Sequence, residues 1–129
     1  MWRLNSIVID ISQFKNLRLH SGFIFREIEL TDTPIMDAIG REAVAQTSAI
    51  AGTFRLFIRS GLSDKELSIT LYQEILEAAS VAVADPPATV IDFNEAGFER
   101  AAHEAYERWG NASPANLNLL LQLYEFGGK

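Results

Sequence analysis

The most informative stretch of the sequence reads Thr53-Phe54-Arg55-Leu56-Phe57-Ile58-Arg59-Ser60-Gly61-Leu62-Ser63-Asp64-Lys65-Glu66. Residues 53–59 predict a half-buried strand, because the apolar side chains of Phe54, Leu56 and Ile58 recur at every second position. Ser63 and Glu66 form the pattern of a capping box, in which each side chain accepts a hydrogen bond from the other residue's backbone amide. This stretch therefore predicts a strand that leads through a short loop into a capped helix.

The helix that begins at Ser63 is predicted to run over residues 63–84, until the pair Pro86-Pro87 stops it. At about 100° per residue its apolar side chains cover an arc of roughly 200°, which is wider than the stripe of an ordinary surface helix. The remaining arc forms a narrow polar seam made of Glu66, Thr70, Gln73, Glu77 and Ser80, with Glu74 at its edge. Such a seam lines either open solvent or a cleft.

The residues before this stretch predict a strand, a hairpin and a helix. Residues 6–11 are rich in β-branched side chains and indicate a strand. Residues 17–19 and 23–30 flank a turn at Gly22 and indicate a hairpin. Thr31-Asp32-Thr33-Pro34 is typical of a helix start, with Asp32 or Thr33 as the cap. We expect that helix to run to about residue 51 and to end at Gly52.

The residues after the long helix predict two further helices. Residues 89–93 indicate either a short strand or an extended linker, and Asp92 or Asn94 then caps a helix over residues 95–109. Ser113-Pro114 opens a last helix. We therefore expect one α+β domain over residues 1–129, with a small mixed or antiparallel sheet packed on three to four helices.

The composition limits which classes of partner we expect the protein to bind and where in the cell we expect it to be. The chain carries 17 acidic and 11 basic residues, for a net charge of −6. Nucleic-acid binding depends on Lys and Arg neutralising phosphates, so we expect neither a nucleic-acid partner nor an anionic membrane surface. There are no cysteines, which excludes disulfides and thiolate metal sites. Without a signal-like N-terminus or a membrane-spanning apolar run, the expected location is the cytoplasm.

The order of the elements around the polar seam carries one resemblance to a known family. A strand leads into a helix that reads Gln73-Glu74-Ile75-Leu76-Glu77, and a second helix then carries Glu99 followed by the small residues Ala101 and Ala102. Over residues 53–109 this arrangement resembles the small zincin-like metallopeptidases of the gluzincin kind. In that family the strand runs beside the substrate, the first helix carries H-E-x-x-H, and the next helix supplies a third metal ligand from a Glu.

The resemblance implies a site at the seam with a degenerate motif. Glu74 matches the general base that activates a metal-bound water, while Glu77 and Gln73 stand where the two histidine ligands would be. Glu99 stands where the third ligand would be, and His103 lies one helical turn further on and would add a nitrogen ligand. The implied cofactor is zinc or another divalent cation, and a site without metal is the equal alternative, because a neutral amide is a weak zinc ligand.

Two functions follow as expectations. The first is a degenerate or inactive zincin-like metallopeptidase, with a cleft between strand 53–59 and the seam that holds a divalent metal or a peptide. The alternative is a non-enzymatic acidic interaction module that sequesters a partner or serves as an accessory protein, which the net charge of −6 favours. In both cases the expected partner is a peptide or a protein.

Overall fold

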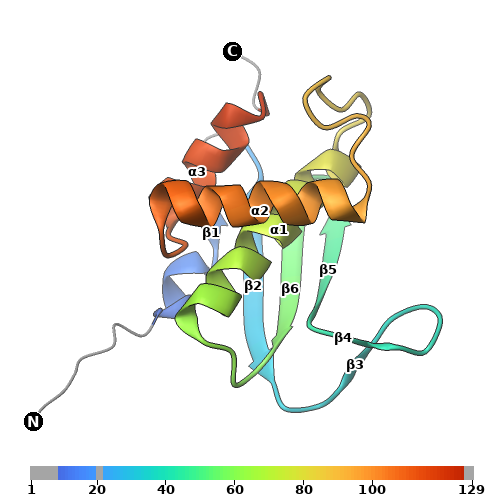
Figure 1. The fold of residues 1–129 in the computed structure, drawn as a ribbon, viewed down its shortest axis with the longest axis vertical. Helices are drawn as coiled ribbons and strands as arrows, with labels where there is room; N and C mark the ends of the chain where they lie inside the picture. Colours follow the sequence, from blue (N-terminus) through green and yellow to red (C-terminus); the bar gives the residue numbers. More distant parts are fainter. Residues whose placement is uncertain (1–8, 20–21, 127–129) are drawn as a thin grey trace, which may run out of the picture.

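The computed structural model describes residues 9–19 and 22–126, and over these residues the chain has an α+β fold (Figure 1). Its main sheet is mixed: the second strand in spatial order pairs parallel to the third, and both outer pairs are antiparallel. In spatial order the four strands are β1 (Leu17–Arg18), β2 (Ile24–Thr31), β6 (Thr53–Arg59) and β5 (Ala45–Ile50).

The three helices predicted after strand 53–59 are confirmed, together with the residues that cap their N-terminal ends. They are α1 (Asp64–Ala82), α2 (Glu95–Trp109) and α3 (Pro114–Leu123). Ser63 and Glu66 make both hydrogen bonds of the predicted capping box. The side chain of Asn94 accepts from the Gly97 amide at the start of α2, and Ser113 does the same for the Asn116 amide at the start of α3. Helix α1 ends two residues before the predicted boundary, at Ala82.

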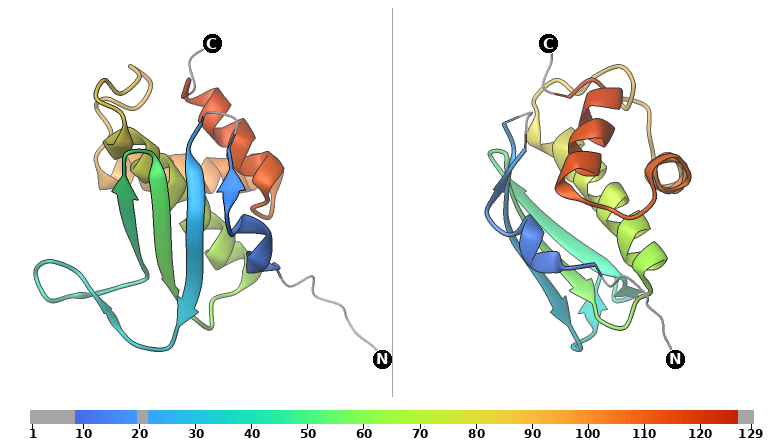
Figure 2. Two further views of the ribbon diagram at one scale, coloured as in Figure 1. Left: turned by 180° about the vertical axis from the view of Figure 1, so that it is seen from behind. Right: turned by 90° about the vertical axis from the view of Figure 1, so that its left-hand side faces the viewer.

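The helix predicted over residues 34–51 is wrong. These residues form β3 (Ile35–Met36) and β4 (Glu42–Ala43), which pair with each other, and then β5. Figure 2 shows β3 and β4 as an arm that projects from the body of the molecule. The two residues between β5 and β6, Ala51 and Gly52, both have positive φ angles and make a tight hairpin turn. Gly52 therefore serves a hairpin, whereas the sequence pattern assigned it to the end of a helix.

The helix prediction fails because residues 45–50 pair with β6, which lies outside the segment that has the helix-like pattern. All six residues of β5 pair antiparallel with β6, from Ala45 opposite Ile58 to Ile50 opposite Thr53. Their side chains alternate between half-buried and exposed, as in a strand with one wet face. In this arrangement the apolar side chains of Ile39 and Ile50 are exposed.

The N-terminal region differs from prediction in one further place. Residues 6–8 of the predicted strand lie outside the described residues, and Ile11–Phe14 forms a short 3₁₀ helix. The cause is local, since the Asp10 carboxylate accepts hydrogen bonds from both the amide and the hydroxyl of Ser12 and so caps this turn. The hairpin of β1 and β2 is confirmed, with a φ of +94° at Gly22. Further along the chain, residues 89–93 were expected to form a short strand or an extended linker, but residues 88–92 form turns that bury Val90.

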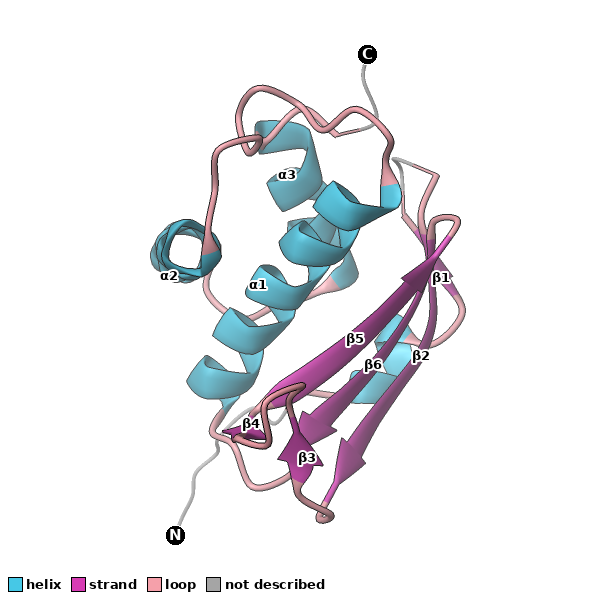
Figure 3. Cartoon of the chain, turned by 90° about the vertical axis from the view of Figure 1, so that its right-hand side faces the viewer, coloured by secondary structure: helices cyan, strands magenta, loops and turns pink. Residues whose placement is uncertain are grey.

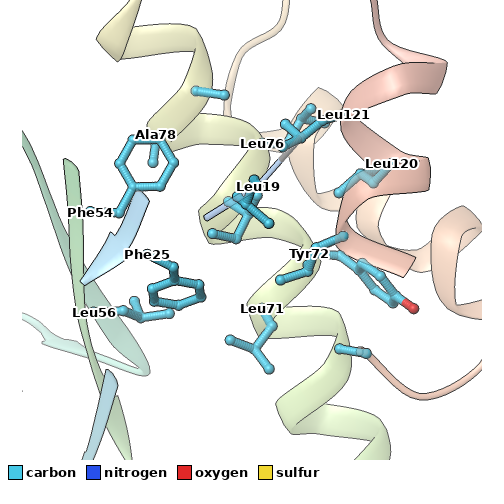
Figure 4. Close-up of a cluster of buried hydrophobic side chains, with 14 of the residues drawn as sticks. Leu19, Phe25, Phe54, Leu56, Leu71, Tyr72, Leu76, Ala78, Leu120 and Leu121 are labelled. Atoms are coloured by element: carbon cyan, nitrogen blue, oxygen red, sulfur yellow. The ribbon is translucent and has the colours of Figure 1, made fainter. Parts of the chain in front are cut away.

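Helix α1 lies at the centre of the core (Figure 4). One side packs on the sheet: in Figure 4 Leu71 lies across from Phe25 and Leu56, and Ala78 lies beside Phe54. The opposite side buries Tyr72 and Leu76 against the other two helices, where the small residues Ala101, Ala102 and Ala105 of α2 and the leucines Leu117, Leu120 and Leu121 of α3 are also buried. The wide apolar arc predicted for α1 is explained by these two packed sides.

One side of α1 packs on neither the centre of the sheet nor α3. Along that side lies β5, which is the last strand of the sheet in spatial order. Helix α2 crosses over α1 and brings its first residues to the same side (Figure 1). Among the described residues, no helix is long and apolar enough to cross a membrane.

Candidate functional site

The polar seam of α1 lines a groove. Gln73, Glu74 and Glu77 are each half-buried, and the walls around them come from α1, from β5 and from the start of α2. Figure 3 shows this side of the molecule, with α1 lying between β5 and α2. Of the two explanations that the sequence left open for the seam, solvent or cleft, the structure shows the cleft. Its strand wall is β5, and the predicted wall, strand 53–59, is one strand further in.

The groove has two halves that meet at Glu74. The first, which we call the acidic half, is lined mainly by charged and polar residues: Asp37, Arg41, Glu42, Arg59, Glu66, Thr70, Gln73, Glu74, Glu95, Glu99 and His103. The second, the apolar half, adds mainly apolar residues to Glu74, Glu77 and Glu95: Ala78, Val81, Pro86, Val90, Ile91, Phe93 and Phe98. Ala45, Glu74 and Glu95 line both halves, so we describe them together as the β5 groove.

Thr47 of β5 fixes the position of Glu74 at this junction. The Thr47 hydroxyl donates a hydrogen bond to Oε1 of Glu74 at 2.5 Å. One helical turn along, the side-chain amide of Gln73 donates to Oε2 of Glu77 at 3.2 Å. The edge strand and the seam are therefore joined by a hydrogen bond from Thr47 to Glu74. Within the seam, Gln73 is hydrogen-bonded to Glu77.

The backbone of β5 presents hydrogen-bonding groups on its outer side, beside this groove. The Arg59 amide donates to the Val44 carbonyl, which places the Ala45–Ile58 pair between two widely spaced ladder bonds. Ala45 and every second residue after it, Thr47 and Ala49, then direct their own N–H and C=O groups away from β6. No strand among the described residues pairs with that outer edge. The side chains of the same three residues face the helices, and they are small.

Burial raises the pKa of Glu74 above its ordinary range, and the neighbouring charges of Glu77 and Glu95 raise it further, against the hydrogen bond from Thr47, which lowers it. Burial also raises the pKa of Glu77, with a contribution from Glu95, while the hydrogen bond from Gln73 acts in the opposite direction. The junction of the two halves is therefore a place where negative charge is poorly solvated and where a cation would be stabilised.

Because the pKa of Glu74 is raised, we expect the effect of Glu74→Gln on the free energy of unfolding to depend on pH. Because the folded protein holds the Glu74 proton more tightly than the unfolded chain does, the resulting stabilisation is complete below about pH 4.5, the ordinary pKa, and is lost as the pH rises through the raised pKa. Glutamine stays neutral and still accepts from Thr47. In urea unfolding we expect the variant to gain free energy of unfolding relative to wild type as the pH is raised from 4.5 to mildly alkaline values.

The matched control for this prediction is Glu104→Gln, which removes an exposed carboxylate on α2 outside the groove. We expect its difference from wild type to stay within about 0.5 kcal/mol across the same range. A difference between Glu74→Gln and wild type that does not change with pH would contradict the prediction.

The structure brings four of the five predicted site residues to one half of the groove. Gln73, Glu74, Glu99 and His103 line the acidic half, while Glu77 lines the apolar half and accepts the hydrogen bond from Gln73. Within the described parts of the chain, no group of three or more His, Cys, Asp or Glu residues is arranged to hold a metal ion. The zinc or other divalent cation implied by the resemblance therefore stays a prediction, and we assign no chemical step to a metal.

Sequence reasoning missed Thr47, Glu95 and the backbone of β5. Thr47 and its neighbours were assigned to a helix, which hid both the edge strand and its contact with Glu74. Glu95 was read only as the first residue of α2. The pair Ala51-Gly52, followed by the alternating strand 53–59, was the available signal for a hairpin and hence for a strand before it.

Comparisons with protein families, with curated proteins and with solved structures find no match to this chain.

Proposed function

We propose that this protein binds an extended segment of another polypeptide along the outer edge of β5 and does not hydrolyse it. The observation that carries this proposal is the open edge of β5 beside the groove. Its outward-facing N–H and C=O groups, at Ala45, Thr47 and Ala49, pair with no strand among the described residues and are the groups that an added strand would pair with.

The composition of β5 supports the same function. Its six residues, Ala45 to Ile50, contain no charged residue and no proline. Proteins usually protect an exposed edge with such residues, because an unprotected edge is a template for pairing with another chain. The volumes of the acidic and apolar halves, 660 and 680 Å³, are in the range of ligand-binding sites. An added strand would therefore find both backbone partners and room for its side chains.

The proposal takes one part of the zincin-like resemblance and leaves out the other. A strand that runs beside the substrate is a feature of that family, and in our proposal β5 has this role. Catalysis is left out because Gln73 supplies a weakly coordinating amide that already donates to Glu77. The zincin-like architecture itself stays a prediction, and so does the divalent-metal site. The acidic interaction module expected from composition is the form of the function that we favour.

The test is a selection from a random-sequence peptide library against the whole protein, followed by amide hydrogen exchange. We expect selected peptides to slow exchange at Thr47 and Ala49, whose amides face the open edge. Exchange at Gln46 and Ser48, whose amides already bond to β6, should change less. Protection of several backbone amides in alternation is the signature of an added strand.

Two outcomes would count against the proposal. Failure to enrich any peptide, or protection confined to residues outside the groove, would exclude strand addition at β5. Stoichiometric zinc uptake by protein purified without chelator, together with cleavage of the selected peptides, would favour the metallopeptidase over the binding module.

A further inference from the structure

The position of the two halves along β5 sets the kind of segment that the edge accepts. We infer that the bound segment carries a lysine or arginine and a large apolar residue on the same face, four positions apart. This inference rests on the proposed function and names the chemistry of the partner.

The first step concerns which side chains of a bound segment enter the groove. In a β-ladder, residues that lie opposite each other place their side chains on the same face of the sheet. The side chains of Ala45, Thr47 and Ala49 face the helices and are half-buried. Side chains of the segment opposite these three residues must therefore also point toward α1 and α2, and the residues between them must point toward solvent. This holds for a parallel and for an antiparallel segment.

The second step concerns the basic position. Ala45 lines both halves, beside Glu74 and Glu95, and the preceding residues Glu42 to Val44 line only the acidic half. The two guanidinium groups in that half have acidic neighbours of their own: Arg41 forms an ion pair with Asp37, and Arg59 interacts with Glu66. Glu74, Glu95 and Glu99 have no ion pair of this kind among the described residues. A basic side chain opposite Ala45 is therefore complementary in charge to this end of the edge.

The third step concerns the apolar position. Ala49 lines only the apolar half. Because Thr47 contacts Glu74, and β5 and α1 run upward together in Figure 1, the later residues of α1 lie beside the later residues of β5. Here Val81 and Ile91 line the groove with 75% and 56% of their surface exposed, next to the half-buried ring of Phe93. A large apolar side chain opposite Ala49 would cover these groups. Ala45 and Ala49 are separated by about 13 Å along the strand.

Charge also decides between a partner peptide and a second copy of this chain. Pairing β5 with β5 of another copy would bring two grooves rich in carboxylates together, in a protein whose net charge is −6. A segment with a basic residue removes this repulsion and places its cation where Glu74 and Glu77 are poorly solvated. The observations therefore favour a basic segment as the occupant.

The experiment compares two synthetic peptides of identical composition, each of about seven residues in a threonine background. In the first, a lysine and a phenylalanine are four positions apart and share a face. In the second they are three positions apart and point to opposite faces. By isothermal titration calorimetry at low salt we expect the first peptide to bind about tenfold more tightly, since only it can fill both halves at once.

A pair of variants assigns the basic position. Glu95→Gln should weaken binding of the first peptide by about threefold to tenfold, and Glu104→Gln, on α2 outside the groove, should leave it unchanged. Equal affinity of the two peptides, with library peptides still bound at β5, would overturn this inference and leave the proposed function standing. Absence of any peptide binding would overturn both. Dimerisation of the protein through β5, in place of peptide binding, would assign the edge to a second copy.

Discussion

Replacing Phe54 by alanine is expected to lower the free energy of unfolding by about 3 to 5 kcal/mol. The Phe54 side chain has 0% of its surface exposed, and its ring stacks on that of Phe23 with centroids 5.1 Å apart. It lies on the central strand β6, between the sheet and α1, so its removal leaves a cavity that neighbouring elements cannot close without moving. Urea unfolding followed by circular dichroism measures the loss, provided that the variant still unfolds in one transition.

Phe57→Ala is the matched control, because the two residues share a strand and a residue type and differ in the face they occupy. Phe57 is 37% exposed on the opposite face of β6, and we expect its replacement to cost below about 1 kcal/mol. Equal losses at the two positions would contradict the assigned face of β6, since a slip of one residue in register moves every side chain to the other side.

The second large effect is expected from proline at two neighbouring positions of β5. The ladder directs the Ser48 amide toward Arg55 of β6 and the Ala49 amide toward the open edge. Ser48→Pro removes a ladder donor and leaves a carbonyl of β6 without its partner, which should cost about 1 to 3 kcal/mol of stability. Ala49→Pro removes no ladder bond, so we expect a change below about 1 kcal/mol.

The same pair of variants separates stability from binding. Ala49→Pro removes a donor that an added strand needs and places a ring at the edge, so it should weaken the binding of library-selected peptides by more than about tenfold while the protein stays folded. Urea unfolding and calorimetry measure the two effects on the same samples. If Ala49→Pro were folded and bound peptides as tightly as wild type does, the outer edge of β5 would not be the binding surface. If it destabilised the protein as much as Ser48→Pro, the assigned direction of the amides would be wrong.

The elements that sequence reasoning placed correctly are those whose determinants lie close together in the chain. The N-terminal ends of α1, α2 and α3 are set by side chains that accept hydrogen bonds from amides three residues away, as Ser63, Asn94 and Ser113 do. The inward face of β6 follows from alternation within seven residues. Such signals can be read without knowing what the element packs against, because the bonds that produce them are local.

Residues 34–51 show where this reasoning fails. Their apolar positions are compatible with a helix, and a proline and a glycine stand where a helix would begin and end. The competing structure is stabilised by pairing with β6 and by packing of Ala45 and Ala49 on the helical layer. Tertiary pairing of this kind overrides a modest local preference, as it often does for strands.

For the groove too, local patterns predicted one part of the structure and missed another. The periodicity of α1 predicted a narrow polar seam that contains Gln73, Glu74 and Glu77, and it predicted that the rest of the helix is buried. It did not determine what lies beside the seam, because Thr47 is 27 residues away from Glu74 in sequence and comes from a strand that local patterns mistook for a helix. Nor did it show that Gln73 and Glu77 hydrogen-bond to each other, or that Glu77 lines a different half of the groove from Glu99 and His103.

By itself, then, the sequence determined an α+β chain with a capped central helix, a buried neighbouring strand and a polar seam, since these depend on periodicity and on hydrogen bonds within a few residues. Only the tertiary structure decided that the seam lies beside an open strand edge, because strand order is set by pairing between distant residues, which no local pattern encodes. In the folded protein the carboxylates of the seam therefore form one wall of the β5 groove.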